Sequence, residues 1–377
     1  MKEKQNLKLM PLSEIENLRV HGRTNGCLSP LTLFWTGSML ELNARGSELW
    51  IEIEADYDEY EPWISILING AQVSRMMLTV GRYWICVFRG MNADIVKNVR
   101  IVKDVQAMSG DPECLLQFHA VKFDGAFLPV AEKPYKIEFV GDSLTSGEGL
   151  VGAKGEEDWI PMWFGAVNNY AVLTAQAFNA DYRIVSQSGW GVLTGWDNNP
   201  HNNIPEYYEK LCGLLNGERN IALEAQMDND FTAWQPDIVV VNLGTNDMSA
   251  FNQPEWRDES SGECYKQRRN EDGSFQEEDL KAFEDAVTEF LAKLRHCNPK
   301  AHIVWAYGMA GLLMMPAIYR AVDAYTKVNN DKKISVFQLP NTTEEEEGSR
   351  FHPGVAAHEK AAKELTEYLK NLLFDQK

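Results

Sequence analysis

The sequence predicts a three-layer α/β/α domain with a parallel sheet, preceded by a small all-β domain of the sandwich or jelly-roll type. Three observations lead to this fold class. The chain has 377 residues, more than the roughly 250–300 at which one hydrophobic core stops growing. Short strand-like runs fill residues 30–125, and alternating strands and helices follow residue 134. We therefore place a boundary near the proline at 134, with domains at 1–131 and 132–377.

The N-terminal strands are recognised by their periodicity and by one turn. Residues 49–55 alternate apolar and polar side chains, as a half-buried strand does. Asn69-Gly70 separates the apolar runs 63–68 and 71–78, and Asn-Gly between two such runs is the strongest short signal for a hairpin. Further runs lie at 83–88, 99–102 and 115–123. Short strands at this spacing predict a sandwich.

The C-terminal half alternates apolar runs of strand length with helical stretches. This alternation predicts parallel strands joined by helices that cover both faces of the sheet. In open sheets of this class, the reactive site lies at the carboxyl ends of the strands. The predicted strands are 136–140, 182–186, 237–242, 301–306 and 334–337, and the predicted helices are 167–178, 204–216, 278–296, 315–328 and 354–373.

Three segments place reactive side chains at the boundaries of these elements. Ser143 follows the first strand in Gly-Asp-Ser-Leu, and Asn246 follows the third strand in Gly-Thr-Asn-Asp. His352 comes just before the final helix. A serine becomes a nucleophile when a histidine takes its proton, and an amide donor can stabilise the oxyanion that develops. These residue types suit ester hydrolysis.

These segments resemble blocks I, III and V of the SGNH (GDSL) hydrolases over roughly residues 135–377. The N-terminal half is similar to the sandwich domain in front of the hydrolase in carbohydrate esterase family 2, through the segments 21–24 and 34–38 and the β-rich run behind them. That family removes acetyl groups from plant-type polysaccharides. The resemblance therefore implies an SGNH-hydrolase fold and a carbohydrate O-acetyl esterase that acts on mannan or xylan through a serine acyl-enzyme.

The resemblance also implies roles for individual residues. Ser143 is the expected nucleophile and His352 the expected base. The expected oxyanion donors are the N–H of Ser143, the side chain of Asn246 and a glycine N–H from block II, residues 186–191. Gly191 is favoured for that glycine and Gly189 is the alternative. A glycine suits this position because its bare backbone can approach the substrate closely.

The chain departs from the family pattern at two positions. Ser186 replaces the Asn that usually opens block II, and Ser349 stands where the family usually has the Asp of the triad. Either a backbone carbonyl orients the imidazole, or a carboxylate arrives from elsewhere, such as the run Glu344–Glu347. Members of carbohydrate esterase family 2 include serine–histidine dyads, so the missing aspartate does not exclude catalysis.

Three other polar residues near these blocks are predicted to have structural roles. Asp142 and Asp247 lie in turns, where aspartate is favoured as a turn or cap residue. His358 lies on the final helix, six residues after His352, so the helical spacing predicts that it points elsewhere, on the surface.

Aromatic residues are abundant between positions 159 and 196. Sugar rings stack on flat aromatic faces, so Trp196 and Trp190 are candidate substrate-binding residues. Trp196 lies on the loop after block II, where the esterase family tends to carry an aromatic platform. The alternative for most of these side chains is packing between the helices and the sheet.

The composition of the chain argues against several classes of binding partner. The formal net charge of −19 argues against nucleic acid and against an anionic membrane surface. The six cysteines have no zinc-ligand spacing, and the hydrolase chemistry needs no cofactor. Scattered unpaired thiols and the absence of an apolar stretch behind residues 1–6 favour a cytoplasmic protein. It would instead be secreted if a signal peptide had been removed.

Two alternatives to the acetyl esterase remain open at this point. The first keeps the chemistry and changes the substrate, as in a lipase or thioesterase of the same superfamily. The second is a carbohydrate-binding protein whose hydrolase domain is inactive, which only the missing aspartate supports. An acetylated oligosaccharide or polysaccharide is the expected partner of the favoured function.

Overall fold

The computed structural model describes residues 7–374, so the segment 1–6 used above to judge a signal peptide lies outside it. The chain divides into two compact units. The first unit continues to Lys133 and also takes in residues 160–162 and 210–229. The second unit begins at Pro134 and contains the rest of the described chain. The boundary expected from the sequence lies at residue 131, and residues 160–162 and 210–229 were expected in the second domain.

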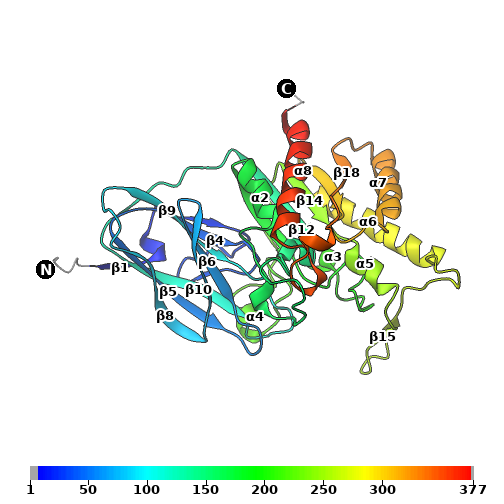
Figure 1. Ribbon diagram of the computed structural model, residues 1–377, viewed down its shortest axis with the longest axis horizontal. Coiled ribbons are helices and arrows are strands. Elements are labelled where there is room, and N and C mark those ends of the chain that lie inside the picture. The colour runs from blue at the N-terminus through cyan, green and yellow to red at the C-terminus, as the bar shows by residue number, and fades with distance from the viewer. Residues whose placement is uncertain (1–6, 375–377) are drawn as a thin grey trace. The chain divides into compact units, whose positions relative to one another are not determined.

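The first unit is a sandwich of two antiparallel sheets, drawn mainly in blue and cyan in Figure 1. One sheet contains β1 (Lys8–Pro11), β10 (Leu115–Phe123), β5 (Glu48–Asp56) and β8 (Gly81–Arg89), with β3 (Leu31–Thr32) beside β10. The other contains β11 (Ala126–Leu128), β4 (Met39–Arg45), β9 (Val96–Lys103), β6 (Trp63–Ile68) and β7 (Ala71–Met77), with β2 (Arg19–His21) beside β4.

Side-chain alternation explains how the two sheets share a core. Along β5 every second residue is buried, and Ile51 and Ile53 pack in one cluster with Leu40 and Leu42 of the other sheet. The predicted hairpin at 69–70 is confirmed. Its two turn residues have φ of 54° and 84°, and it joins β6 to β7 in antiparallel register. Positive φ at both turn positions is what the Asn-Gly pair favours.

The predicted helix 204–216 is wrong beyond its first turn. A short helix α3 (Ile204–Tyr207) is observed, and the chain then leaves helical geometry. The Leu211 N–H donates to the carbonyl of Met227 (2.7 Å), and the carbonyl of Leu211 accepts from Trp35 Nε1 (2.7 Å). These bonds hold the segment 210–229, which contains α4 (Glu218–Ala222), within the first unit. Tertiary pairing has overridden local helix propensity here.

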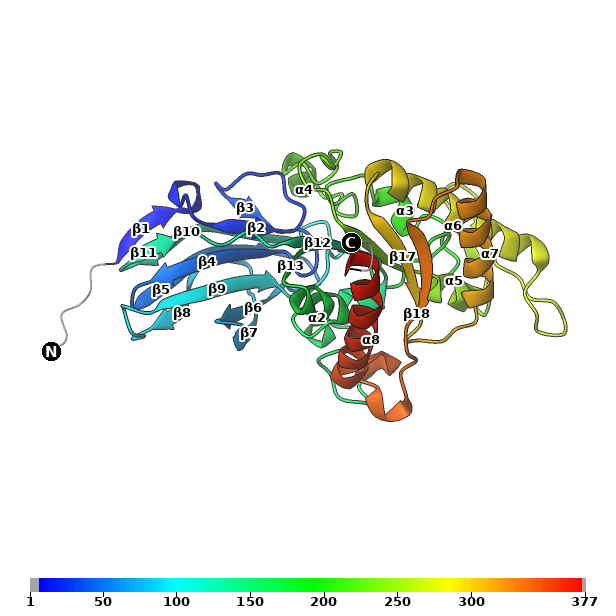
Figure 2. The same cartoon turned by 90° about the horizontal axis from the view of Figure 1, so that it is seen from above.

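The second unit contains a parallel five-stranded sheet with helices on both faces. Its strand order is β13 (Ala180–Ser186), β12 (Tyr135–Gly141), β14 (Ile238–Asn242), β17 (His302–Tyr307) and β18 (Ile334–Gln338). Figure 2 shows α2 (Tyr170–Ala177) and α8 (Val355–Phe374) on one face, with α6 (Glu277–Cys297) and α7 (Met315–Asn329) on the other. The three-layer arrangement predicted from the sequence is confirmed.

The strand order locates the reactive edge of this sheet. β12 lies between β13 and β14 although it precedes both in the chain, so the connections leave it in opposite directions. Crevices at such switch points, outside the carboxyl ends of the strands, are where ligands bind in open α/β sheets. Two short helices begin here, α1 (Ser143–Ser146) after β12 and α5 (Thr245–Ala250) after β14. A two-stranded hairpin, β15 (Trp256–Arg257) with β16 (Cys264–Tyr265), follows α5.

Two further observations concern the described residues as a whole. None of the helices between residues 7 and 374 has the length and apolar composition needed to cross a lipid bilayer. Over the same residues, no three His, Cys, Asp or Glu side chains gather in a way that could hold a metal ion.

Candidate active site

Ser143 is the first residue of α1, directly after strand β12. Asp142 caps this short helix, because its carboxylate accepts a hydrogen bond from the Leu144 N–H (3.1 Å). Gly141 is required by close packing, since a Cβ there would lie 2.1 Å from Thr145 Oγ1. The sequence of the turn therefore places the serine at the carboxyl edge of the sheet, with the residue 6% exposed.

His352 and Ser143 are brought together from positions far apart in the chain. The Nε2 atom of His352 lies 3.0 Å from Ser143 Oγ. The Nδ1 atom lies 2.8 Å from the main-chain carbonyl oxygen of Arg350. A carbonyl can only accept, so Nδ1 carries the imidazole proton and Nε2 accepts from the serine hydroxyl. This is the tautomer that a general base needs in order to take the proton of the nucleophile.

The Arg350 carbonyl thus occupies the position of a triad carboxylate, which is one of the two arrangements the sequence left open. The run Glu344–Glu347 takes another course. Its first three residues form the 3-10 helix η3 (Glu344–Glu346), whose carboxylates pair with Lys154 and Lys360 (3.0 and 3.3 Å). Ser349, at the usual aspartate position, is fully buried, and its hydroxyl makes no hydrogen bond to the His352 imidazole in the described part of the chain.

The backbone of block II distinguishes the two candidate glycines for the oxyanion hole. The Gly191 N–H donates to the Asn202 carbonyl (3.2 Å), so it is already used within the loop. The N–H groups of Ser143 and Gly189 donate to no acceptor in the described part of the chain. This arrangement favours Gly189, the alternative in the sequence analysis, over Gly191.

Asn246 lies on α5 and points toward the same edge of the sheet. Its Nδ2 donates to the Trp190 carbonyl (3.0 Å) and to Asp142 Oδ2 (3.3 Å). Burial raises the pKa of Asp142 to about 8, with a smaller contribution from the nearby Asp247 carboxylate. Asn246 links the end of β12, block II and the end of β14.

Asp247 has a different role from Asp142. Its two carboxylate oxygens accept hydrogen bonds from the N–H groups of Val192, Leu193 and Thr194, at 2.8 to 3.2 Å. The side chain is buried, and burial raises the pKa of Asp247 to about 6. Asp247 thus fixes the loop that follows block II. Neither aspartate makes a hydrogen bond or an ion pair with His352 in the described structure.

The two candidate substrate-binding tryptophans differ in exposure. Trp196 is 49% exposed, and its main-chain N–H donates to the Gly189 carbonyl (2.9 Å). Trp190 is buried and packs against Tyr207 with ring centroids 5.0 Å apart. Trp196 therefore presents a ring to solvent beside the candidate oxyanion glycine, whereas Trp190 has the packing role named as the alternative for these aromatics.

The prediction that His358 lies on the surface is wrong. The residue is fully buried, its ring stacks on Tyr170, and its Nδ1 accepts a hydrogen bond from the Tyr170 N–H (3.1 Å). Burial lowers the pKa of His358 to about 3, and His352 adds to this effect. The helical spacing did not reveal that α2 covers this side of α8.

Two contacts near the same site were not predicted from the sequence, one of Ser186 and one of Glu148. The Ser146 hydroxyl donates to the hydroxyl oxygen of buried Ser186 (2.8 Å), so the departure from Asn is accommodated locally. The carboxylate of Glu148 is also buried, and it binds Arg350 Nε (2.8 Å). No sequence motif predicts the contacts of the Arg350 carbonyl or of Glu148, because a single sequence carries no pattern for main-chain acceptors or for buried ion pairs.

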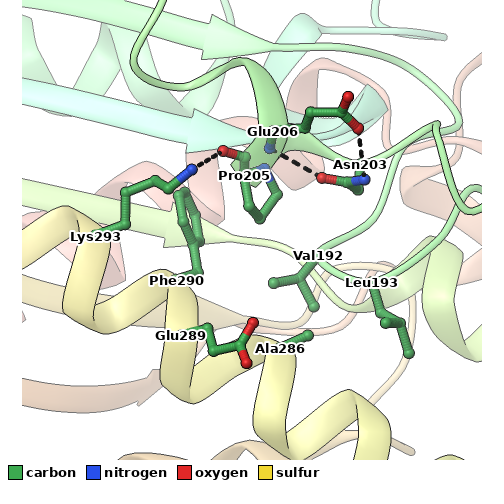
Figure 3. A pocket seen from close by; sticks show the side chains of 9 residues that line it. All are labelled: Val192, Leu193, Asn203, Pro205, Glu206, Ala286, Glu289, Phe290 and Lys293. Carbon is green, nitrogen blue, oxygen red and sulfur yellow. Dashed lines mark hydrogen bonds between the residues drawn. The ribbon is translucent and has the colours of Figure 1, made fainter.

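One pocket of about 250 Å³ lies beside the loop after block II (Figure 3). Its polar groups largely satisfy one another, because Lys293 Nζ donates to the Pro205 carbonyl (2.8 Å) and Asn203 Oδ1 accepts from the Glu206 N–H (2.9 Å). Neither Ser143 nor His352 lines it. This pocket is separate from the candidate active site.

Comparison with known proteins supports the sequence-based recognition. Residues 139–360 match the GDSL-like Lipase/Acylhydrolase family. An acetyl xylan esterase (Est2A) from the rumen bacterium Butyrivibrio proteoclasticus has a similar structure, with a TM-score of 0.96 and 47% identity. The alignment covers 97% of this chain and 98% of that one. The predicted hydrolase fold and the resemblance to this group of esterases are therefore confirmed.

Two more distant relatives extend the comparison. A family two carbohydrate esterase from Clostridium thermocellum, solved in complex with cellohexaose, has a TM-score of 0.78 at 23% identity, over 95% of this chain and 99% of that chain. The Cellulase/esterase CelE of Acetivibrio thermocellus is 26% identical over 350 residues, which are 90% of this chain. The chain spans only 37% of the length of that curated relative.

Proposed function

Since the chain belongs to the GDSL-like lipase/acylhydrolase family, we propose that it is a serine esterase that removes O-acetyl groups from carbohydrates. The expected substrates are acetylated oligosaccharides or polysaccharides of the xylan or mannan type. The observation that carries the ester chemistry is the hydrogen bond between Ser143 Oγ and His352 Nε2 at 3.0 Å. The likeness to an acetyl xylan esterase over nearly the whole chain supports the choice of substrate.

The first half of the reaction forms an acyl-enzyme. His352 Nε2 takes the hydroxyl proton of Ser143 as Oγ attacks the acetyl carbonyl carbon. The resulting oxyanion receives hydrogen bonds from the Ser143 N–H, the Gly189 N–H and the Asn246 amide. When the intermediate collapses, the bond to the sugar oxygen breaks, and His352 returns its proton to that oxygen. The sugar leaves with a free hydroxyl group, and the acetyl group stays on Ser143.

The second half of the reaction releases acetate. His352 takes a proton from a water molecule as the water oxygen attacks the acetyl-Ser143 carbonyl. Collapse of this second intermediate breaks the bond to Ser143 Oγ, and the proton held by His352 returns to the serine. The enzyme regains its starting state and needs no metal or organic group for either step.

The orientation of His352 takes the place of the family's aspartate in this mechanism. A triad carboxylate holds the imidazole in the correct tautomer, and the Arg350 carbonyl at 2.8 Å from Nδ1 can do the same. A carbonyl dipole stabilises the imidazolium less than a full charge does. Because the carbonyl can still orient the imidazole, the missing aspartate does not argue for the inactive binding protein.

The exposed ring of Trp196 supports a sugar rather than a lipid as the leaving group. It lies beside Gly189 and is about half exposed, so one face can stack on a sugar ring while the acetyl group reaches Ser143. A long acyl chain would instead need an extended apolar channel at the serine.

Acetate release tests the proposal directly. The protein is incubated with acetylated xylan and mannan oligosaccharides, and with aryl esters of acetate and octanoate, with Ser143→Ala as the control. Release of acetate from a glycan by the native protein and not by the variant is the expected result. Cleavage restricted to octanoate would make the protein a lipase-like enzyme. Binding of the oligosaccharides with no turnover of any ester would make it a binding protein.

A further inference from the structure

Glu148 is a buried carboxylate at the edge of the active site that the mechanism above does not use. Its side chain is 3% exposed. One oxygen lies 2.8 Å from Arg350 Nε, and the other lies 3.9 Å from His352 Nε2. Gly147 and Gly149 flank it with φ of 78° and 77°. A buried carboxylate is costly unless it is paired, so this position calls for an explanation.

The segment that Glu148 contacts has an unusual backbone. Arg350 and Phe351 both adopt left-handed φ of 57°, a region that residues other than glycine rarely occupy. Phe351 is 75% exposed and has little packing to hold it there. Without an external restraint, two consecutive left-handed residues are expected to relax. The carbonyl that accepts the His352 Nδ1–H belongs to the first of them.

The restraint comes through Arg350. Its guanidinium binds Glu148 and also donates to the Glu157 carbonyl (2.6 Å), while its main-chain N–H donates to the Glu156 carbonyl (2.7 Å). The side chain and the backbone of Arg350 are therefore fixed from two directions. Of these partners, Glu148 alone is a side chain, and it is buried next to the imidazole.

We propose that Glu148 is a positioning residue, which holds Arg350 so that its main-chain carbonyl stays aligned with His352 Nδ1. This inference rests on the proposed serine esterase function. Glu148 binds Arg350 directly at 2.8 Å, whereas its other oxygen lies 3.9 Å from His352 Nε2, beyond the length of a hydrogen bond. The pair acts by geometry: it keeps the acceptor in place as His352 gains and loses its proton.

The inference predicts a specific pattern among variants. Glu148→Met and Arg350→Met remove the contact, let the carbonyl move and lower kcat for an aryl acetate about 100-fold, the typical effect of a small misplacement. KM changes less than threefold, because neither side chain binds the ester. The double variant is no slower than either single one, because both substitutions break the same contact. Glu148→Gln keeps an acceptor for Arg350 Nε and retains most of the activity.

A matched control uses the exposed ion pair between Lys154 and Glu344, which joins the same two stretches of chain. Lys154→Met is expected to leave kcat unchanged. Thermal unfolding is measured for every variant. If Glu148→Met is unfolded, the kcat of Arg350→Met tests the positioning role instead. Arg350 is partly exposed, and replacing it leaves the turn after β12 intact.

The outcomes separate this inference from the proposed function. A native protein that cleaves no ester contradicts the proposed function itself. An active native protein with unchanged kcat in both Met variants overturns the positioning role. Additive losses in the double variant also overturn it, as does a loss in Glu148→Gln equal to that in Glu148→Met, which would indicate a role for the charge.

Discussion

The indole of Trp196 lies against the α-carbon of Gly189, so that a Cβ on this glycine would be 3.0 Å from Trp196 Cδ1. The same two residues are joined by a hydrogen bond from the main-chain N–H of Trp196 to the Gly189 carbonyl (2.9 Å). One residue carries an unused N–H, and the other carries an exposed ring. Under the proposed function, recognition of the sugar and stabilisation of the oxyanion would therefore depend on the same short piece of backbone.

Gly189→Ala is expected to lower kcat about 100-fold. Its φ of 81° disfavours alanine, and the new methyl group would press on Trp196, so the N–H would turn away from the oxyanion. Kinetics with an aryl acetate measure the effect. In Gly191→Ala the new Cβ would lie 2.4 Å from Asp247 Oδ2, so loss of thermal stability is expected to dominate instead. A normal kcat in a folded Gly189→Ala protein would remove Gly189 from the oxyanion hole.

Trp196→Ala is expected to raise KM for acetylated xylan or mannan oligosaccharides about fivefold. Loss of one stacking contact costs about 1 kcal/mol, and 1.4 kcal/mol corresponds to a factor of ten. The KM for a small aryl acetate should stay within a factor of two, because no sugar ring is present. Equal losses for both substrates would assign Trp196 to the support of the loop.

Ser349→Asp, which restores the family's usual residue, is expected not to raise activity. Ser349 is fully buried, and a Cβ on Gly152 would lie only 2.3 Å from its side chain, so the pocket has no room for a carboxylate. The Nδ1 of His352 is already paired with the Arg350 carbonyl. We expect a loss of about 2 kcal/mol in the free energy of unfolding. A gain in kcat with unchanged stability would contradict this explanation.

His358→Asn is expected to make stability less sensitive to acid. Burial holds the pKa of His358 at about 3 in the folded protein, whereas the unfolded chain has the usual value of about 6.5. The unfolded state therefore binds an extra proton between these values, and stability falls as the pH decreases from 6.5 toward 3.

The full loss between pH 6.5 and pH 3 is about 5 kcal/mol, at 1.36 kcal/mol for each pKa unit, and about 3 kcal/mol of it falls above pH 4.5. Asparagine can still accept the hydrogen bond from the Tyr170 N–H and does not titrate. Urea unfolding at pH 7 and pH 4.5 measures the effect, with the same change at exposed His201 as the control. A drop in stability that is the same in native protein and variant would show that other groups cause it.

The strands of the second unit could be predicted to within about two residues because each contains a short apolar segment of strand length. In β14 every residue is buried, and such a run has few alternatives. The long helices α6 and α7 were also found, since their buried residues recur at helical spacing. By contrast, residues 208–216 are held by partners that lie elsewhere in the chain, and no local pattern encodes those partners.

In the candidate site, too, features encoded by local sequence could be predicted, and features that depend on remote partners could not. Ser143, Asn246 and His352 could be proposed from the sequence because the chemistry of their side chains is visible there. The choice between Gly189 and Gly191 depends on which N–H a neighbouring carbonyl already uses. The partner of His352 is a main-chain oxygen, which every residue type supplies. His358 was misplaced because its burial depends on α2, which is remote in sequence.

The return of residues 210–229 to the first unit changes what can be exchanged between relatives. Leu211 is bonded to Trp35, Arg219 pairs with Asp56 (3.0 Å), and Asn220 Nδ2 donates to the Pro112 carbonyl (3.0 Å). A chimera joined near residue 133 would combine a sandwich from one parent with its bracing segment from the other. Transplanting the front domain as a working module therefore requires two crossover regions, one on each side of the inserted segment, in addition to the junction itself.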